Sequence, residues 1–234
     1  NADLCVMAYV TLLVPEPVLN APRLGSIQYH PSLLPMHKGP SSINWPIIFG
    51  KTQTGLSIFW PDEGLDTGPI LLQKEVEIGP DDTLGSLYFN HLFPMGVAAM
   101  TEAVDLVRAE TAPRIEQDPS GGSYEGWCTP DDVRIDWHQD VDQIYNMIRG
   151  ANPQPGAWTT VAGKRLTVLD SSKSDNTDGD PGTVIAADAS GITVAANGGS
   201  ICISRFKPQG GSKLSAAEMM EQSPLNAGDV LGVD

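Results

Sequence analysis

Residues 25–35 read GSIQYHPSLLP, a short strand-like stretch that ends at His30 and passes into a loop bounded by Pro31 and Pro35. A histidine at the end of a buried strand is well placed for function, because ligands of open α/β sheets bind at the carboxyl ends of strands. The stretch therefore predicts a sheet and, at one end of it, a candidate site.

Further predicted strands and helices flank this stretch. The apolar run LCVMAY at 4–9 predicts a strand buried on both faces, and VPEPVLNAP predicts a short helix entered through a proline turn. Downstream we expect a short or kinked helix at 42–50, strands at 54–60 and 70–78, and a helix over 83–110 that Pro94 interrupts. This alternation predicts an α/β fold with a Rossmann-like, mostly parallel sheet. Because the chain opens almost directly in a core strand, we expect the sheet to be N-terminally truncated.

After about residue 117, a loop-like stretch and short alternating runs replace the earlier pattern of strands and helices. Residues 118–140 predict a linker, and VDQIYNMIRG at 141–150 predicts an amphipathic helix. Five short runs follow, AWTTVA, KRLTVLD, GTVIAAD, GITVAA and SICISRF, while the polar segment 171–180 predicts an exposed loop. Short strands with tight turns predict a small OB-like β-barrel. We therefore expect an α/β domain at 1–117, or the C-terminal part of one, and a β-barrel domain at 141–234.

The composition restricts the class of partner. The chain has 234 residues and a formal net charge of -15, with 24 Gly and 19 Pro, which favours a loop-rich fold. Residues 1–130 carry 6 Lys and Arg against 15 Asp and Glu, and residues 131–234 carry 8 against 14. Neither half has the basic surface that nucleic-acid binding usually requires, so we expect no DNA partner.

The cysteines and the hydropathy restrict the covalent cross-links, the metal sites and the location that we expect. Cys5, Cys128 and Cys202 are far apart and odd in number, which argues against a disulfide framework and a structural zinc site. With no other cluster of ligand residues in the sequence, we expect no metal. No apolar run reaches about 18 residues, so we expect no membrane span, and reduced thiols favour a cytoplasmic location. The oligomeric state is left open.

Two segments carry residues suited to acid–base chemistry. His30 ends one predicted strand, and Asp66 lies in DEGLDTGP at 62–69, just after another. Because these strands are neighbours in the sequence, the imidazole and the carboxylate could meet in one crevice and share a proton. Gln28 points to the same side of its strand as His30 and could donate a hydrogen bond to an oxyanion. The alternatives stay open: a core imidazole, an ordinary acidic turn and a packed polar group.

Motifs along most of the chain resemble the folate-dependent formyltransferase family. They are YHPSLLPMHKG, the SINW helix, DEGLDTGPILLQ, IRGANPQPGAWT, the later GTV strand and the closing LNAGDVLGV. The forms YHPSLLP, FWPDEGLDTG, LFPMG, TAPR and YEG look most similar to the hydrolase domain of 10-formyltetrahydrofolate dehydrogenases. The family also includes methionyl-tRNA formyltransferases and sugar-nucleotide formyltransferases.

The resemblance implies formyl chemistry with 10-formyltetrahydrofolate as donor and tetrahydrofolate as product. Its catalytic residues match His30 and Asp66. The family's Asn, two residues before the His, is replaced here by Gln28, whose amide reaches one methylene further. This departure puts the oxyanion contact in doubt and favours the hydrolase type over the tRNA enzymes.

The resemblance also implies a folate pocket. Its walls would be Leu33, Leu34 and Pro35, with Ser32 beside them. The backbone of 62–66, including Asp62, Glu63 and Gly64, would bind the polar edge of the pteridine. Tyr9 and Val10 could close the other side, or serve only as core. His37 and Lys38 could meet the glutamate tail of the folate, or belong to a solvated loop.

Three readings of function stay open at this point. The first is a formyl hydrolase or formyltransferase that acts through His30 and Asp66, with water favoured as the acceptor and an amine on a sugar nucleotide left open. The second is a methionyl-tRNA formyltransferase, which the acidity of the chain disfavours. The third is a folate-binding domain that has lost catalysis.

Overall fold

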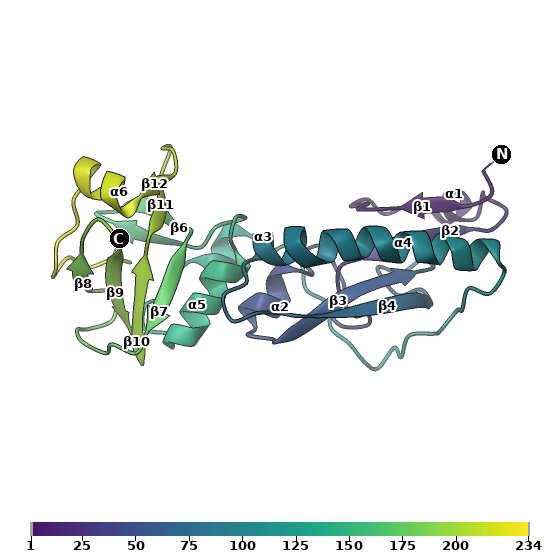
Figure 1. The fold of residues 1–234 in the computed structure, drawn as a ribbon, viewed down its shortest axis with the longest axis horizontal. Coiled ribbons are helices and arrows are strands. Elements are labelled where there is room, and N and C mark those ends of the chain that lie inside the picture. Colours follow the sequence, from purple (N-terminus) through teal and green to yellow (C-terminus); the bar gives the residue numbers. More distant parts are fainter. Residues whose placement is uncertain (1, 234) are drawn as a thin grey trace. The chain divides into compact units, whose positions relative to one another are not determined.

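The computed structural model describes residues 2–233, which divide into two compact units (Figure 1). The first unit takes in the described residues up to 46, together with 51–79 and 86–127. The second takes in 47–50, 80–85 and the described residues from 128 onward.

The first unit is built on a four-stranded mixed sheet in the order β1-β2-β3-β4. Its strands are β1 (Cys5–Met7), β2 (Ser26–His30), β3 (Gln53–Phe59) and β4 (Ile70–Glu77). Between β1 and β2 the chain forms α1 (Glu16–Leu19), which begins after Pro15 as the proline turn predicts. Between β2 and β3 it forms the five-residue α2 (Asn44–Ile48).

The expectation of a mostly parallel sheet is wrong. Only β1 and β2 pair in parallel, while β2 with β3 and β3 with β4 pair antiparallel. A parallel crossover needs a dozen or more residues, usually as a helix. The loop between β3 and β4 has no helix, and α2 is only about 7.5 Å long at 1.5 Å per residue. Neither connection has a helix long enough to return the chain across the sheet.

The long helix after β4 is interrupted as the sequence predicts. It runs as α3 (Leu84–Leu87), a π-helical turn η1 (Tyr88–Leu92) and α4 (Phe93–Arg108). Pro94 has no N–H to donate, and the π turn lies immediately before it, with the Phe93 N–H donating to the Tyr88 carbonyl. The helix is therefore interrupted at the point where Pro94 cannot donate a helical hydrogen bond.

Helix α4 covers one face of the sheet (Figure 1). Ala99 and Ala103 of the helix pack on Ile27, Leu56 and Ile58 of the strands. Because side chains alternate along β2, Gln28 and His30 point to the opposite face from Ile27. The candidate site thus lies on the face that α4 does not cover.

The second unit consists of short helices and antiparallel strands. Its helices are the 3-10 turn η2 (Pro130–Val133), α5 (Val141–Gly150) and α6 (Ala216–Gln222). Asp140 caps α5 by accepting the Asp142 N–H, and Ser215 caps α6 through a capping box with Glu218. Its strands are β5 (Trp158–Val161), β6 (Lys164–Val168), β7 (Ser171–Ser174), β8 (Val184–Ala187), β9 (Ile192–Ala196), β10 (Gly199–Ile203), β11 (Arg205–Pro208) and β12 (Leu214–Ser215).

These strands form two four-stranded sheets, in the orders β7-β10-β9-β8 and β12-β11-β6-β5. Strand pairing does not close them into a barrel within residues 2–233, so the expected OB-like barrel is not confirmed. Two details of the sequence interpretation are wrong. SICISRF is not one strand, because the chain turns at Ser204 and passes from β10 of one sheet to β11 of the other. The expected loop at 171–180 begins with β7, which carries no apolar pattern because its residues are polar and mostly exposed.

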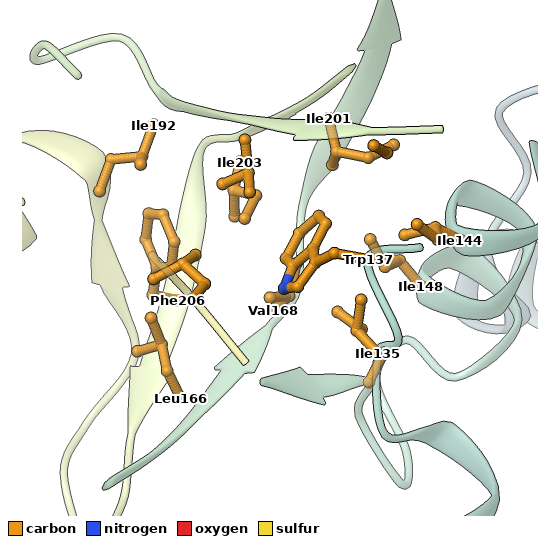
Figure 2. Packing of buried hydrophobic residues seen from close by; sticks show 14 of the residues in the cluster. Ile135, Trp137, Ile144, Ile148, Leu166, Val168, Ile192, Ile201, Ile203 and Phe206 are labelled. Atoms are coloured by element: carbon orange, nitrogen blue, oxygen red, sulfur yellow. The ribbon is translucent and has the colours of Figure 1, made fainter. Parts of the chain in front are cut away.

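An apolar core holds the second unit together (Figure 2). The Trp137 indole lies at its centre, with Val168 beside it and Ile144 and Ile148 of α5 to one side. Its Nε1–H donates to the Thr159 hydroxyl at 3.0 Å, so the buried polar atom of the ring is satisfied.

Within the described part of the chain, no helix is long and apolar enough to cross a membrane.

Candidate functional site

The site begins with His30, the last residue of β2, whose side chain is almost fully buried. Its Nε2 lies 2.9 Å from the main-chain oxygen of His37, and its Nδ1 lies 3.6 Å from Oδ2 of Asp66. The structure therefore brings together the histidine that ends β2 and the aspartate of the loop after β3.

The hydrogen bonds determine which nitrogen of His30 carries a proton. A carbonyl oxygen can only accept, so Nε2–H donates to His37 O. Nδ1 then faces the Asp66 carboxylate, and one exchangeable proton can pass between the two groups. Burial lowers the pKa of His30 below its ordinary 6.5, while the charge of Asp66 and the bond to His37 O oppose that effect. The lowered pKa favours the neutral imidazole, a form that can take up a proton.

Asp66 is held in place by two segments outside its own loop. Its backbone has φ of 57°, in the left-handed region that only a few types of residue tolerate. Its Oδ2 accepts the Gly39 N–H at 2.9 Å, and its main-chain oxygen accepts from the Gln117 amide at 3.0 Å. A carboxylate that is buried, aimed at an imidazole and fixed from both sides is suited to proton transfer.

The rest of the loop between β3 and β4 is shaped by Asp62 and two glycines. Oδ1 of Asp62 accepts from the Gly64 N–H at 3.0 Å and from the Thr67 hydroxyl at 2.7 Å. A Cβ at Gly68 would lie 1.8 Å from the Trp60 carbonyl oxygen, so this position has no room for a side chain. Gly68 is thus required by close approach of the backbone, whereas a Cβ at Gly64 would lie 1.9 Å from the Thr67 hydroxyl.

The loop after His30 is anchored by the hydroxyl of Ser57 and the amide of Gln73. Ser57 Oγ donates to Ser32 O at 2.7 Å and accepts from the Leu34 N–H at 3.0 Å and the Gln73 amide at 2.8 Å. Gln73 also donates to Leu34 O at 2.9 Å. Two residues of the neighbouring strands therefore fix the loop that would line a ligand pocket.

The family model described as Formyl transferase matches residues 1–104, and the one described as Formyl transferase, C-terminal domain, matches residues 128–224. The methionyl-tRNA formyltransferase of Syntrophus aciditrophicus is 37% identical over 233 residues, which is 99% of this chain and 74% of that protein.

The chain belongs to the formyltransferase family. The expected resemblance is therefore confirmed.

A cytosolic 10-formyltetrahydrofolate dehydrogenase from Mus musculus is 48% identical to this formyltransferase-family chain over 171 residues. The match covers 73% of this chain but only 19% of the mouse protein, so the chain spans about a fifth of that relative. Among solved structures, HypX from Aquifex aeolicus in complex with tetrahydrofolic acid shares the fold, with a TM-score of 0.78 and 19% identity. That comparison covers 99% of this chain and 42% of HypX.

The other residues predicted for the site fall into three groups. Gln28 is half-buried on the same face of β2 as His30, and its backbone pairs with Met7 and Phe59. Within residues 2–233 no hydrogen bond holds its side-chain amide, which leaves the amide available to a ligand.

Leu33 and Pro35 are half-buried, whereas Leu34 is buried against Phe59 and Ile70. The Ser32 side chain is fully buried, and its hydroxyl donates to Met36 O at 2.6 Å. Leu34 and Ser32 thus have structural contacts in this formyltransferase-family fold, while Leu33 and Pro35 retain accessible surface.

Glu63 and Gly64 are exposed on the loop, and Val10 is half-buried. Tyr9 is exposed, with its ring 6.5 Å from that of Tyr88 on η1. The contact of Tyr9 with Tyr88 does not connect it to the His30–Asp66 pair.

The sequence interpretation did not foresee Ser57, Gln73 and Gln117, which hold the two loops. Each is a polar residue far along the chain from the loop that it contacts. The one available signal was Gln73, a polar residue in an otherwise apolar run at the start of β4.

No group of three or more potential metal ligands occurs among the residues that the structure describes.

Proposed function

We propose that this formyltransferase-family protein releases or transfers the formyl group of 10-formyltetrahydrofolate. The observation that supports this most directly is the buried His30–Asp66 pair, with 3.6 Å between Nδ1 and Oδ2. The mouse relative is named a 10-formyltetrahydrofolate dehydrogenase, and HypX was solved with tetrahydrofolic acid. These names indicate a folate donor for this chain as well.

In the proposed mechanism, water or an amine attacks the formyl carbon and Asp66 accepts a proton from that nucleophile. Asp66 passes that proton to Nδ1 of His30, and the resulting Nδ1–H donates to the oxyanion that forms from the formyl C=O. The tetrahedral intermediate then collapses, the bond from carbon to N10 breaks, and the stored proton passes to N10. With water as nucleophile the products are formate and tetrahydrofolate.

We propose Gln28 as a second donor to the oxyanion, because its amide shares the His30 face of β2 and has no hydrogen-bond partner within the described residues. Gln28 is the residue that departs from the family's Asn, so its role depends on the longer side chain reaching the formyl oxygen.

For folate binding we propose the two anchored loops. Leu33, Leu34 and Pro35, with the backbone of Ser32, would contact the pteridine on one side. The backbone of Asp62, Glu63 and Gly64 would bind its polar edge. Tyr9 and Val10 are proposed as outer contacts only.

The acceptor is proposed to be water, because identity to the dehydrogenase relative is 48%, against 37% to the tRNA enzyme. Methionyl-tRNA is the second candidate, supported by a match that covers 99% of this chain. The acidity of the chain disfavours it, since tRNA phosphates attract basic surfaces.

We assign formyl chemistry to the domain expected at 1–117, with 118–140 as linker and 141–234 as an accessory domain. A cytoplasmic location is also proposed, because the mouse relative is described as cytosolic.

The test is release of formate from 10-formyltetrahydrofolate, with and without methionyl-tRNA or a sugar-nucleotide amine. We expect formate release in water alone, reduced about 10²–10³-fold in His30→Gln because an oxyanion donor is lost. The matched control is His91→Gln, an exposed histidine of the same unit, which should keep the wild-type rate.

Formyl transfer only to methionyl-tRNA would replace the hydrolase proposal with the second candidate. Folate binding without turnover in any mixture would support a non-catalytic folate-binding domain instead.

A further inference from the structure

A second buried histidine–carboxylate pair, His37 with Glu125, is linked to the first through the main chain of His37. His37 Nδ1 is 3.2 Å from Oε2 of Glu125, and the two side chains are only 9% and 15% exposed. The carboxylate accepts, so Nδ1 of His37 carries the proton. His37 therefore does not project into solvent, where a folate tail would be met.

One member of this second pair, His37, supplies the main-chain oxygen that orients the His30 ring. The main-chain oxygen of His37 accepts from His30 Nε2 at 2.9 Å. For that oxygen to face His30, His37 adopts φ of 55°, a left-handed conformation that is strained for a residue with a Cβ. Such a conformation persists only where neighbouring contacts hold it.

The contacts come from a short strap, residues 122–125, which lies in the stretch expected to be a linker. Ser123 Oγ accepts the His37 N–H at 3.0 Å, and Ser123 O accepts the Lys38 N–H at 3.0 Å. The Ser123 N–H in turn donates to Pro35 O, and the Glu125 N–H donates to Lys38 O. Glu125 adds the one side-chain carboxylate in this set of bonds.

Close packing on both sides leaves the strap little freedom. A Cβ at Gly122 would lie 2.1 Å from Pro35 O, and a Cβ at Gly39 would lie 2.3 Å from Glu125 O. Only glycine fits at both positions, which brings the two backbones into direct contact.

We infer that His37 and Glu125 are positioning residues for His30. Glu125 holds the His37 ring, the strap holds the His37 backbone, and the His37 oxygen keeps the proton of His30 on Nε2. Nδ1 of His30 is thereby directed at Asp66. This inference rests on the proposed function for its effect on rate, and on the geometry alone for its effect on the tautomer.

The experiment combines steady-state kinetics with ¹⁵N NMR of the histidine rings. The chain has four histidines, so the His30 signals can be assigned from the spectrum of His30→Gln. In Glu125→Ala and His37→Ala we expect kcat for formate release to fall about 10–100-fold with KM little changed, because the reacting group is misplaced while the folate loops remain. We expect the same variants to lose the Nε2–H tautomer of His30.

Two further variants separate positioning from a general structural role. His37→Asn should recover most of kcat, because Asn tolerates the left-handed region and can donate to Glu125. Ser123→Ala removes the hydroxyl that accepts the His37 N–H. It should lower kcat and the share of the Nε2–H tautomer, but by less than Glu125→Ala does. This variant tests the inference if Glu125→Ala does not fold. The control is His138→Ala, which breaks an exposed histidine–aspartate contact of the same 3.2 Å length and should change neither readout.

Wild-type kcat together with an unchanged His30 tautomer in Glu125→Ala or Ser123→Ala would overturn the inference. A rise in KM at constant kcat would also overturn it, since that result assigns the pair to substrate binding. If the wild-type chain turns over no formyl donor, the proposed function fails, and the tautomer alone decides the positioning role.

Discussion

The two units bury different kinds of side chain. The core of the second unit is a single large apolar cluster around Trp137 and Phe206 (Figure 2). Between residues 30 and 66, the first unit buries a series of polar groups: His30, Ser32, His37, Ser41, Ser42, Asn44, Thr54, Ser57 and Asp66. Burying an apolar side chain stabilises a fold directly, whereas burying a polar one costs free energy unless it is hydrogen-bonded. The polar cluster therefore points to function rather than stability.

The same contrast holds between two histidine–aspartate contacts. His30 and Asp66 have side chains 6% and 7% exposed, whereas His138 and Asp136 in the second unit are 79% and 60% exposed. Solvent screens the exposed contact, so it contributes little to stability. Because the first contact is buried, the gain or loss of one proton changes its electrostatic energy strongly. Acid–base chemistry depends on such a response.

The largest effect on stability is expected from Phe206→Ala in the second unit. Phe206 is fully buried, so the cavity and the lost transfer free energy should lower the free energy of unfolding by about 3–5 kcal/mol. Denaturant unfolding followed by circular dichroism measures it. Phe89→Ala, at an exposed phenylalanine, should change stability by less than about 0.5 kcal/mol. Equal losses in the two variants would contradict the burial of Phe206 in an apolar core.

A smaller effect is expected from Gly68→Ala in the loop of Asp66. The new Cβ would overlap the Trp60 carbonyl, so the loop must shift, at a cost of about 1–3 kcal/mol. Formate release should fall more steeply than stability, because the shift displaces Asp66. In Gly126→Ala the Cβ meets open space, and both quantities should stay close to wild type. Full activity in Gly68→Ala would show that the loop geometry does not matter to the site.

The free energy of unfolding should depend on pH because His30 is buried. Its pKa is lowered in the fold, mainly by burial, so between that value and its ordinary 6.5 the unfolded chain binds more protons. Stability therefore falls as the pH drops below about 6.5, by at most ~1.4 kcal/mol per pH unit for one proton. Urea unfolding at several pH values should show a flatter profile for His30→Gln. His138→Gln, at the exposed contact, should keep the wild-type slope, and the account fails here if His30→Gln keeps it too.

The smallest effect concerns Cys128 of the second unit. Burial, with the nearby charge of Asp132, raises the pKa of its thiol to about 11, so little thiolate exists at pH 8. Iodoacetamide should therefore modify Cys128 much more slowly in the folded chain than in urea. Peptide mass spectrometry reads the rate, and equal rates in the two conditions would contradict burial of this thiol.

The apolar pattern predicted most strands of both units, and Pro94 predicted an interruption of the long helix, which the structure has just before it at Tyr88–Leu92. It could not predict β7, whose SSKS sequence has no apolar face, or the turn at Ser204, which sends β10 and β11 into different sheets. Strand direction was also missed, because it depends on what the connections can span rather than on the strands themselves.

At the site, His30 and Asp66 were predictable from the resemblance of YHPSLLP and DEGLDTGP to the family's motifs. The strand-end rule alone does not bring them together, because β2 and β3 are antiparallel and their carboxyl ends point in opposite directions. Glu125 and Ser123 were not predictable, since they lie more than 80 residues from His37 in a stretch of polar and glycine residues with no periodic pattern. Only the folded backbone brings such residues together.

The measurement that tests the central claim most directly is the rate of formate release by Asp66→Asn. The account predicts a loss of about 10²–10⁴-fold, the usual contribution of a general acid–base group, in a protein that still folds. Asp118→Asn, at an exposed aspartate of the same unit, should keep the wild-type rate. A folded Asp66→Asn with wild-type turnover would contradict the claim that the buried pair performs the chemistry.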